Sequence, residues 1–229
     1  MKFISIEKFV KNKYNHLLVV LVTFLLFAPA IEDEKVLPGQ HLVTITLILT
    51  IIFCLRVTVT NKKIFWLCVS VAIFALLLDA VSYFIDSHGI SDKIDFFNLM
   101  VSSVFIAWAI ILLMKSMFQA QKVTANTIVG GICVYLLIGI LWALFYILMT
   151  DLRDGMIESE AGASLFYFSF TTLTTLGYGD IVPKGNLAMM LTNFEAISGQ
   201  IYLAVFIARL VGLHTVYELK GNNNTESQS

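Results

Sequence analysis

Residues 164–186 read SLFYFSFTTLTTLGYGDIVPKGN, a short polar stretch with glycines that lies between long apolar segments. Gly177 and Gly179 flank Tyr178, and glycine accepts a positive φ angle without a Cβ clash. Alternating ordinary residues with glycine can turn successive carbonyl groups to the same side of the chain. At membrane depth, irregular backbone is tolerated where it is buried in protein or lines a water-filled path. Successive carbonyls in such a place form a ladder of oxygen ligands suited to a dehydrated monovalent cation.

The composition indicates a membrane protein. Of the 229 residues, 58% are hydrophobic and only 14% are charged, whereas soluble domains keep roughly a quarter of their residues charged. The three cysteines, Cys54, Cys68 and Cys133, lie inside apolar segments, and their spacing suggests neither a disulfide nor a metal site. We therefore expect them to act as small buried hydrophobic residues.

The apolar segments predict six membrane-spanning helices and one shorter helix. A spanning helix needs about 20 residues, and the first two segments lie near the lower limit of that range. The shorter segment, at 164–175, cannot cross a bilayer and is predicted to be a re-entrant helix. The predicted spans are about 15–31, 41–59, 64–85, 95–115, 127–149 and 187–213.

Charge placement predicts the orientation. If the six segments alternate from a cytoplasmic N-terminus, eleven of the fifteen lysines and arginines lie on the cytoplasmic side, as the positive-inside rule requires. Both termini are then cytoplasmic. We expect the protein to lie in the cell (inner or plasma) membrane. The first segment, with Ala28-Pro29-Ala30 at its end, also resembles a cleavable signal peptide. We favour a retained helix, and cleavage would leave the remaining topology unchanged.

The stretch TLGYGD, residues 175–180, resembles the selectivity filter of potassium channels, with Leu176 where valine is commonest. The preceding segment, 165–175, resembles a pore helix, and Pro183 follows as in many family members. The sequence FEAISGQIYLAVFIARLVG, residues 194–212, is similar to the pore-lining inner helix of bacterial channels.

This resemblance extends over about residues 127–213 and implies a fold and an assembly. The fold is an all-α membrane protein with six transmembrane helices, one re-entrant pore helix and a filter loop, assembled as a homotetrameric channel. The carbonyls of Thr175, Leu176, Gly177 and Tyr178 are implied to coordinate K⁺, with the Thr175 hydroxyl completing the innermost site and Gly179 completing the filter.

The resemblance also implies supporting roles behind the filter. The Tyr178 ring is expected to pack against the pore helix, where Thr172 could hold its hydroxyl. Asp180 is expected at the outer mouth, and Tyr167 occupies a position where many relatives carry a tryptophan that donates to this aspartate. Phe168 stands where a second aromatic donor is common and offers none.

Asp79 and Glu195 lie deep in apolar segments, where a side chain facing lipid would be costly, so both are expected to face protein or water. For Glu195 we favour a hydrogen-bonded carboxyl behind the filter over an ion-lining role. Gly199 occupies the position of the inner-helix hinge glycine. Its alternative role is close helix packing, and we favour the hinge.

The chain is predicted to comprise a four-helix transmembrane domain (1–125), a pore domain (126–215) and a disordered cytoplasmic tail (216–229). The first domain has the layout of a voltage sensor, which needs several arginines at every third position of its fourth span. That span contains no arginine and only Lys115 at its inner end. Steep voltage gating is therefore not expected.

The predicted function is passive, selective conduction of K⁺, with K⁺ ions and the lipid bilayer as partners. We expect no enzyme activity, no cofactor and no nucleic acid, because no nucleophile, metal-ligand or complete nucleotide motif is present. A non-selective cation channel is the first alternative. An ion-coupled transporter is the second, although transporters usually show repeated halves with broken helices, and we see no internal repeat.

Overall fold

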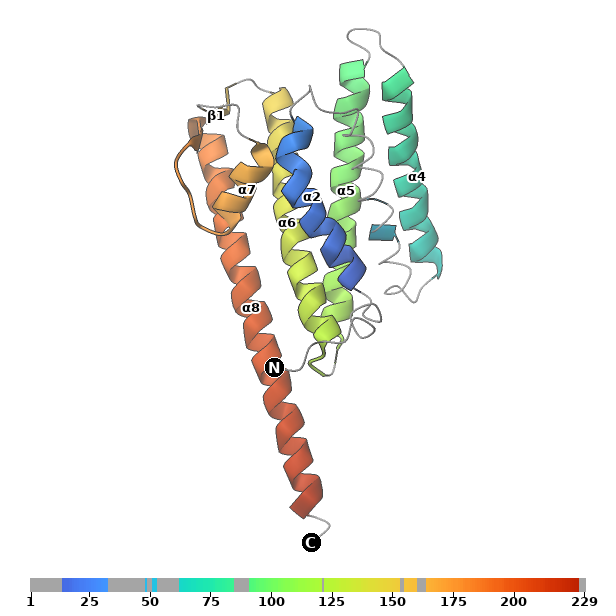
Figure 1. The fold of residues 1–229 in the computed structure, drawn as a ribbon, viewed down its shortest axis with the longest axis vertical. Helices are drawn as coiled ribbons and strands as arrows, with labels where there is room; N and C mark the ends of the chain where they lie inside the picture. The colour runs from blue at the N-terminus through green and yellow to red at the C-terminus, as the bar shows by residue number, and fades with distance from the viewer. Residues whose placement is uncertain are drawn as a thin grey trace.

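The computed structural model describes residues 14–32, 48, 51–52, 62–84, 91–120, 122–152, 155–159 and 164–226. These residues are almost entirely helical, with one two-stranded sheet (Figure 1). The elements are α2 (Asn15–Glu32), α4 (Lys62–Phe84), α5 (Ser91–Phe118), α6 (Ala125–Leu152), β1 (Ile157–Ser159), α7 (Leu165–Leu173), β2 (Ile181–Pro183) and α8 (Gly185–Glu226).

Four of the described helices are long and apolar enough to cross a membrane. Their apolar parts are Lys62–Val81, Lys93–Phe118, Ala125–Leu152 and Gly185–Thr215, with 20, 26, 28 and 31 residues. Helix α2 coincides with the first predicted span, although its described apolar part, Asn15–Leu26, is shorter. The second predicted span falls largely outside the described residues. These helices support a multi-pass membrane protein, and the presence of six membrane spans stays a prediction.

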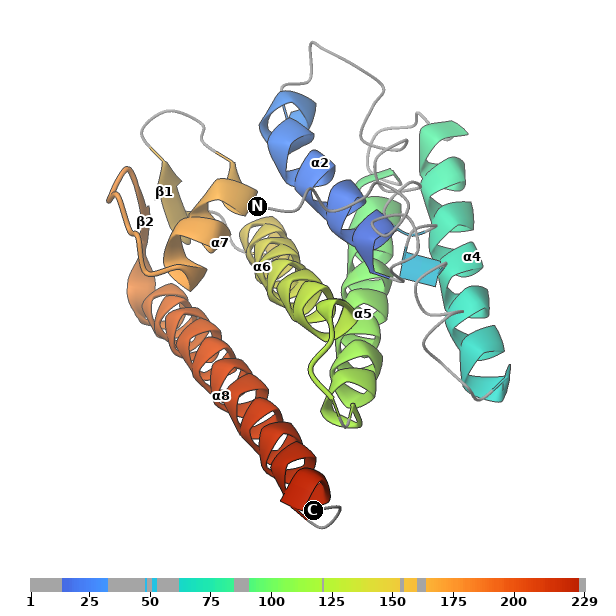
Figure 2. The same ribbon diagram turned by 60° about the horizontal axis from the view of Figure 1, so that its bottom comes forward.

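The spanning helices lie in sequence order across the molecule. Helices α4, α5 and α6 follow one another, and α8 lies on the far side of α6 (Figure 2). Helix α2 packs on α6 and also touches α7, where the rings of Phe24 and Phe166 meet edge to face with centroids 5.3 Å apart. Helix α2 thus contacts the short helix α7 directly.

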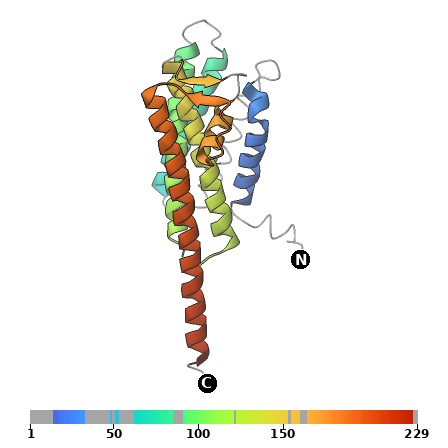
Figure 3. The same ribbon diagram turned by 90° about the vertical axis from the view of Figure 1, so that its left-hand side faces the viewer.

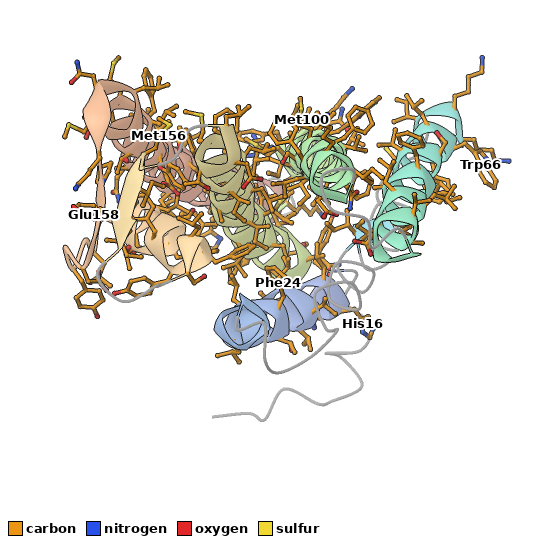
Figure 4. All side chains as sticks on the ribbon, turned by 90° about the horizontal axis from the view of Figure 1, so that it is seen from above. His16, Phe24, Trp66, Met100, Met156 and Glu158 are labelled. Carbon is orange, nitrogen blue, oxygen red and sulfur yellow. The ribbon has the colours of Figure 1, made fainter. Side chains whose placement is uncertain are left out.

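A shared apolar core joins α2, α4, α5 and α6. Several of its buried positions carry small side chains, among them Ala72, Ala109 and Cys133, and small residues let helices approach closely in membranes. Cys68 and Cys133 are both buried and free of disulfides, as the sequence predicted, whereas Cys54 lies outside the described residues. Large apolar side chains such as Trp66 point away from the neighbouring helices, as expected for a lipid-facing surface (Figure 4).

Helix α8 is longer than predicted. The sequence indicated a disordered tail at 216–229, but the helical backbone continues to Glu226 and projects past the ends of the other helices (Figure 3). The difference has a physical cause, because extending an existing helix requires no new nucleation and each added residue gains a backbone hydrogen bond. Polar composition alone therefore did not identify where this helix ends.

Arg209 ties α8 to the end of α5. Its Nη2 atom donates to the carbonyl oxygens of Phe118, of Ala120 at 3.1 Å and of Met117 at 3.4 Å. Its guanidinium also lies over the Phe118 ring, 4.8 Å from the centroid. The last carbonyls of a helix have no partner within the helix and carry partial negative charge. Arg209 therefore caps α5 from another helix.

Replacing Arg209 with glutamine should lower the stability of the folded protein by about 1–2 kcal/mol, since charge-assisted bonds to three carbonyls are lost. Thermal unfolding in detergent, followed by tryptophan fluorescence, measures the change. Arg209→Lys keeps the charge but loses the planar guanidinium that lies over the Phe118 ring, so its melting temperature should fall between those of the wild type and Arg209→Gln. Equal melting temperatures for all three proteins would contradict the capping role.

Candidate functional site

The short helix α7 begins and ends with defined caps. The Ser164 hydroxyl accepts a hydrogen bond from the Phe166 amide at 3.1 Å, the usual way a serine caps a helix N-terminus. After nine residues the helix ends, and the Thr174 amide still donates to the Phe170 carbonyl. The C-terminal end of α7, with its partial negative charge, leads straight into the predicted filter.

The loop after α7 alternates in backbone conformation. Positive φ angles occur at Thr175 (59°), Gly177 (52°) and Gly179 (85°), every second residue of the predicted filter. The amides of Leu176 and Gly177 both donate to the Thr171 carbonyl, at 2.8 and 3.2 Å, which anchors the loop to α7. The two glycines predicted positive φ angles at their own positions. The positive φ of Thr175 was not predicted, because threonine rarely adopts it.

The loop is not covered by its own chain. Leu176 is 55% exposed and Tyr178 is 68% exposed, although both side chains are largely apolar. A Cβ atom added at Gly177 or Gly179 would meet no described atom within 4 Å. In a single chain, these glycines are therefore required by their φ angles and not by lack of space.

At the end of the loop, Asp180 is held by two donors. The Tyr167 hydroxyl donates to Oδ2 of Asp180 at 2.8 Å, and the amide of Ile181 donates to Oδ1 at 3.2 Å. The bond to Asp180 raises the pKa of Tyr167, so this tyrosine remains a donor. The rings of Tyr167 and Tyr178 stack with an interplanar angle of 4° and centroids 6.3 Å apart. Among the described residues, the Thr172 hydroxyl does not bond to Tyr178.

A two-stranded sheet joins the segments before and after α7. Strands β1 and β2 pair antiparallel, with Glu158 opposite Val182. The Lys184 amide donates to the Met156 carbonyl at 2.7 Å, and its Nζ pairs with Glu158 at 2.5 Å. Both ends of the ion pair are exposed, so it is worth little. Met156 directly precedes β1, and Glu158 lies on the strand (Figure 4). The sequence did not predict this sheet, because strands of three residues are too short to show a period.

Phe168 serves as an apolar anchor. Its ring meets that of Tyr146 edge to face at 5.0 Å, and both pack in a small buried cluster with Ile181. This cluster joins α6, α7 and β2. The missing donor at Phe168 is therefore matched by an apolar environment.

Glu195 lies at the junction of three helices. It is completely buried on α8. Its Oε2 atom accepts from the Tyr146 hydroxyl of α6 at 2.5 Å, and its Oε1 atom lies 2.5 Å from the Ser169 hydroxyl of α7. Ser169 also contacts the Gly139 carbonyl of α6 at 2.8 Å. Glu195 thus faces protein, and its two partners, Ser169 and Tyr146, were not singled out in the sequence.

Gly199 allows α8 to approach the end of α7. A Cβ atom there would lie 2.6 Å from the carbonyl oxygen of Leu173, the last residue of α7, and 2.8 Å from its Cδ1. Helix α8 runs without interruption through this position. The structure therefore supports the packing role that the sequence analysis ranked second, and the hinge role stays a prediction.

Asp79 lies apart from the filter, between α4 and α5. It is buried, and its Oδ1 atom accepts from the Asn98 amide group at 3.4 Å. This agrees with the expectation that Asp79 faces protein and not lipid.

The comparisons with known proteins agree with this architecture. Residues 123–215 match the family described as ion channel. The inward rectifier potassium channel Kirbac3.1 of Paramagnetospirillum magnetotacticum is 38% identical over 79 residues, covering 34% of this chain and 26% of that protein. The two pore potassium channel a of Oryza sativa subsp. japonica is 27% identical over 96 residues, covering 42% and 26%. The voltage-gated potassium channel Kch of Escherichia coli (strain K12) is 37% identical over 70 residues, covering 29% and 17%.

Two conclusions follow from these matches. Residues 123–215 resemble the ion channel family, a family of transport proteins. The predicted resemblance to the pore-loop potassium channel superfamily is confirmed for this region. The chain aligns with about a quarter or less of the length of these relatives. No solved structure gives a significant match.

Replacing Tyr167 with phenylalanine should weaken the outer end of the loop. The change removes the donor to Asp180 while keeping the ring that stacks on Tyr178. For the channel proposed below, we expect ion current to decline a few-fold faster during sustained opening. Tyr167→Trp, which restores an aromatic donor, is the matched control and should return the decline toward the wild-type rate. Identical time courses for the phenylalanine and wild-type proteins would show that this bond does not stabilise the loop.

Replacing Gly199 with alanine should push α8 away from α7 and destabilise the protein by about 1–3 kcal/mol, the usual cost of overpacking. Gly212 provides the control, since it lies on the same helix and a Cβ there would meet no described atom within 4 Å. Gly212→Ala should leave the melting temperature unchanged or raise it, because alanine favours a helix by about 1 kcal/mol over glycine. If both variants melt alike, the close approach at Gly199 is not what requires glycine there.

Proposed function

We propose that this chain forms a potassium-selective channel that conducts K⁺ passively down its gradient. The observation that carries the proposal is the positive φ at every second residue of 175–179, directly after the C-terminal end of α7. Such alternation lets successive carbonyls face one side and replace the hydration shell of the ion. In this proposal the carbonyls of Thr175, Leu176, Gly177 and Tyr178 bind K⁺.

We further propose a homotetramer, because one chain supplies one carbonyl ladder and a filter surrounds the ion with four. The exposed apolar loop side chains Leu176 and Tyr178 support a neighbouring chain at this position. Helix α8 adds an exposed apolar stripe at helical spacing, suited to partner chains and lipid. The stripe comprises Phe194, Ile197, Ile201 and Val205.

The proposed channel lies in the cell (inner or plasma) membrane with both termini cytoplasmic, following the distribution of positive charge. It is not steeply voltage-gated. Helix α5, the fourth predicted span, contains no arginine, and its only basic residue in the last turn is Lys115. Moving few charges through the membrane field supplies too little energy for a steep response. The four helices before the pore domain then serve a purpose other than sensing voltage.

Recording from the purified protein in planar bilayers under opposing K⁺ and Na⁺ gradients tests this proposal. The reversal potential should follow the K⁺ gradient, and the open probability should change little with voltage. A reversal potential indifferent to the two ions would instead support a non-selective cation channel. Transport against a gradient, driven by a second ion, would support an ion-coupled transporter.

Replacing Gly177 with alanine should abolish K⁺ flux into liposomes, because a Cβ at its φ of 52° strains the backbone at a position proposed to bind K⁺. Gly185, with a φ of 80° and no described atom within 4 Å of its Cβ position, is the matched control outside the filter. Gly185→Ala carries comparable backbone strain and should retain flux. Unchanged flux in Gly177→Ala, with the protein folded in detergent, would refute the filter assignment.

A further inference from the structure

At the junction around Glu195, the Ser169 hydroxyl lies within hydrogen-bond distance of two other oxygen atoms. The Ser169 oxygen lies 2.5 Å from Oε1 of Glu195 and 2.8 Å from the carbonyl oxygen of Gly139. A serine hydroxyl has one hydrogen to donate, and a backbone carbonyl has none. With an ionised carboxylate, Ser169 would face two acceptors with a single proton, and one of these short oxygen–oxygen contacts would lack a hydrogen.

One arrangement gives every contact a hydrogen. Ser169 donates to the Gly139 carbonyl, and Oε1 of Glu195 carries a proton that it donates to the Ser169 oxygen. Tyr146 donates to the other carboxyl oxygen, Oε2, at 2.5 Å. The contacts then form one directed chain from Tyr146 through Glu195 and Ser169 to Gly139, and it links α8 to both α6 and α7.

The surroundings of Glu195 favour the same protonation state. The carboxyl is 0% exposed, and the partners that face it, Tyr146 from α6 and Ser169 from α7, are both neutral. On its own helix, Ser198 donates to the Glu195 backbone carbonyl and not to the carboxyl. No ion pair within the described parts of the chain reaches Glu195. A buried carboxylate without a cation is very costly, and such a group takes up a proton instead.

We propose that Glu195 is a neutral carboxylic acid whose proton, donated to Ser169, fixes α7 between α6 and α8. Ser169 and Tyr146 are then positioning residues for the loop. The connection is short, because Thr171, two residues after Ser169, accepts the amides of Leu176 and Gly177. The significance of the junction for permeation rests on the proposed function, whereas the protonation of Glu195 does not.

Infrared spectroscopy of the full-length protein in lipid at neutral pH tests the protonation directly. The difference spectrum between wild type and Glu195→Gln should contain the carbonyl stretch of a protonated acid. In Ser169→Ala, that stretch should move to the higher frequency of an acid without a hydrogen-bond acceptor. Absence of the band from the wild type, or an unchanged frequency in Ser169→Ala, would overturn the proposal even if the protein does not conduct K⁺.

Ion flux tests the positioning role separately. A glutamine amide can donate to Ser169 and accept from Tyr146 without any charge, so it retains the same pattern of bonds. K⁺ flux through Glu195→Gln should therefore exceed that through Glu195→Ala by about tenfold. In Glu195→Ala the buried hydroxyls of Ser169 and Tyr146 lose their partner, and a loss of this kind changes the population of the intact junction by about that factor. Gel filtration in detergent establishes that each variant is folded. A folded Glu195→Gln that conducts no better than Glu195→Ala would show that hydrogen bonding by a neutral group is not what the junction requires.

Discussion

The position of the end of α7 is the constraint on which the rest of this structure depends. A helix that stops inside the protein leaves its last carbonyls without partners within the helix, and a membrane supplies no water to bond them. The Leu173 carbonyl is approached by α8 at Gly199 and by the hydroxyl of Tyr135 at 3.3 Å. Two spanning helices therefore hold one helix end in place, and the loop with alternating φ angles starts from there.

The helices before residue 123 contact the matched region, 123–215, at more than one place. Phe24 of α2 meets Phe166 at the start of α7, while Arg209 of α8 caps the end of α5. Helices α5 and α6 also pack against each other and contribute to the apolar core. Displacing α2 or α5 would therefore disturb α7 and α8 through these direct contacts.

Sequence analysis located the elements better than it located their partners. The short helix and the two long helices that flank it lie where the lengths of the apolar segments predicted, because hydrophobic length is a property of consecutive residues. The bonds of Glu195 to Tyr146 and Ser169 could not be predicted, since these partners lie 49 and 26 residues away. For Gly199, the sequence could not distinguish a hinge from a close helix contact, because that contact is defined by the distance between Gly199 and the Leu173 carbonyl in the folded chain.

By itself, the sequence indicated that this chain belongs in a membrane, which segments are long enough to cross it, and which loop resembles a carbonyl filter. Each of these follows from local composition or from a short motif. The tertiary structure alone decided which side chains meet behind the loop, that Thr175 joins the glycines in positive φ, and that α8 continues to Glu226. These depend on how distant segments pack and on the backbone path, and neither is encoded in neighbouring residues alone.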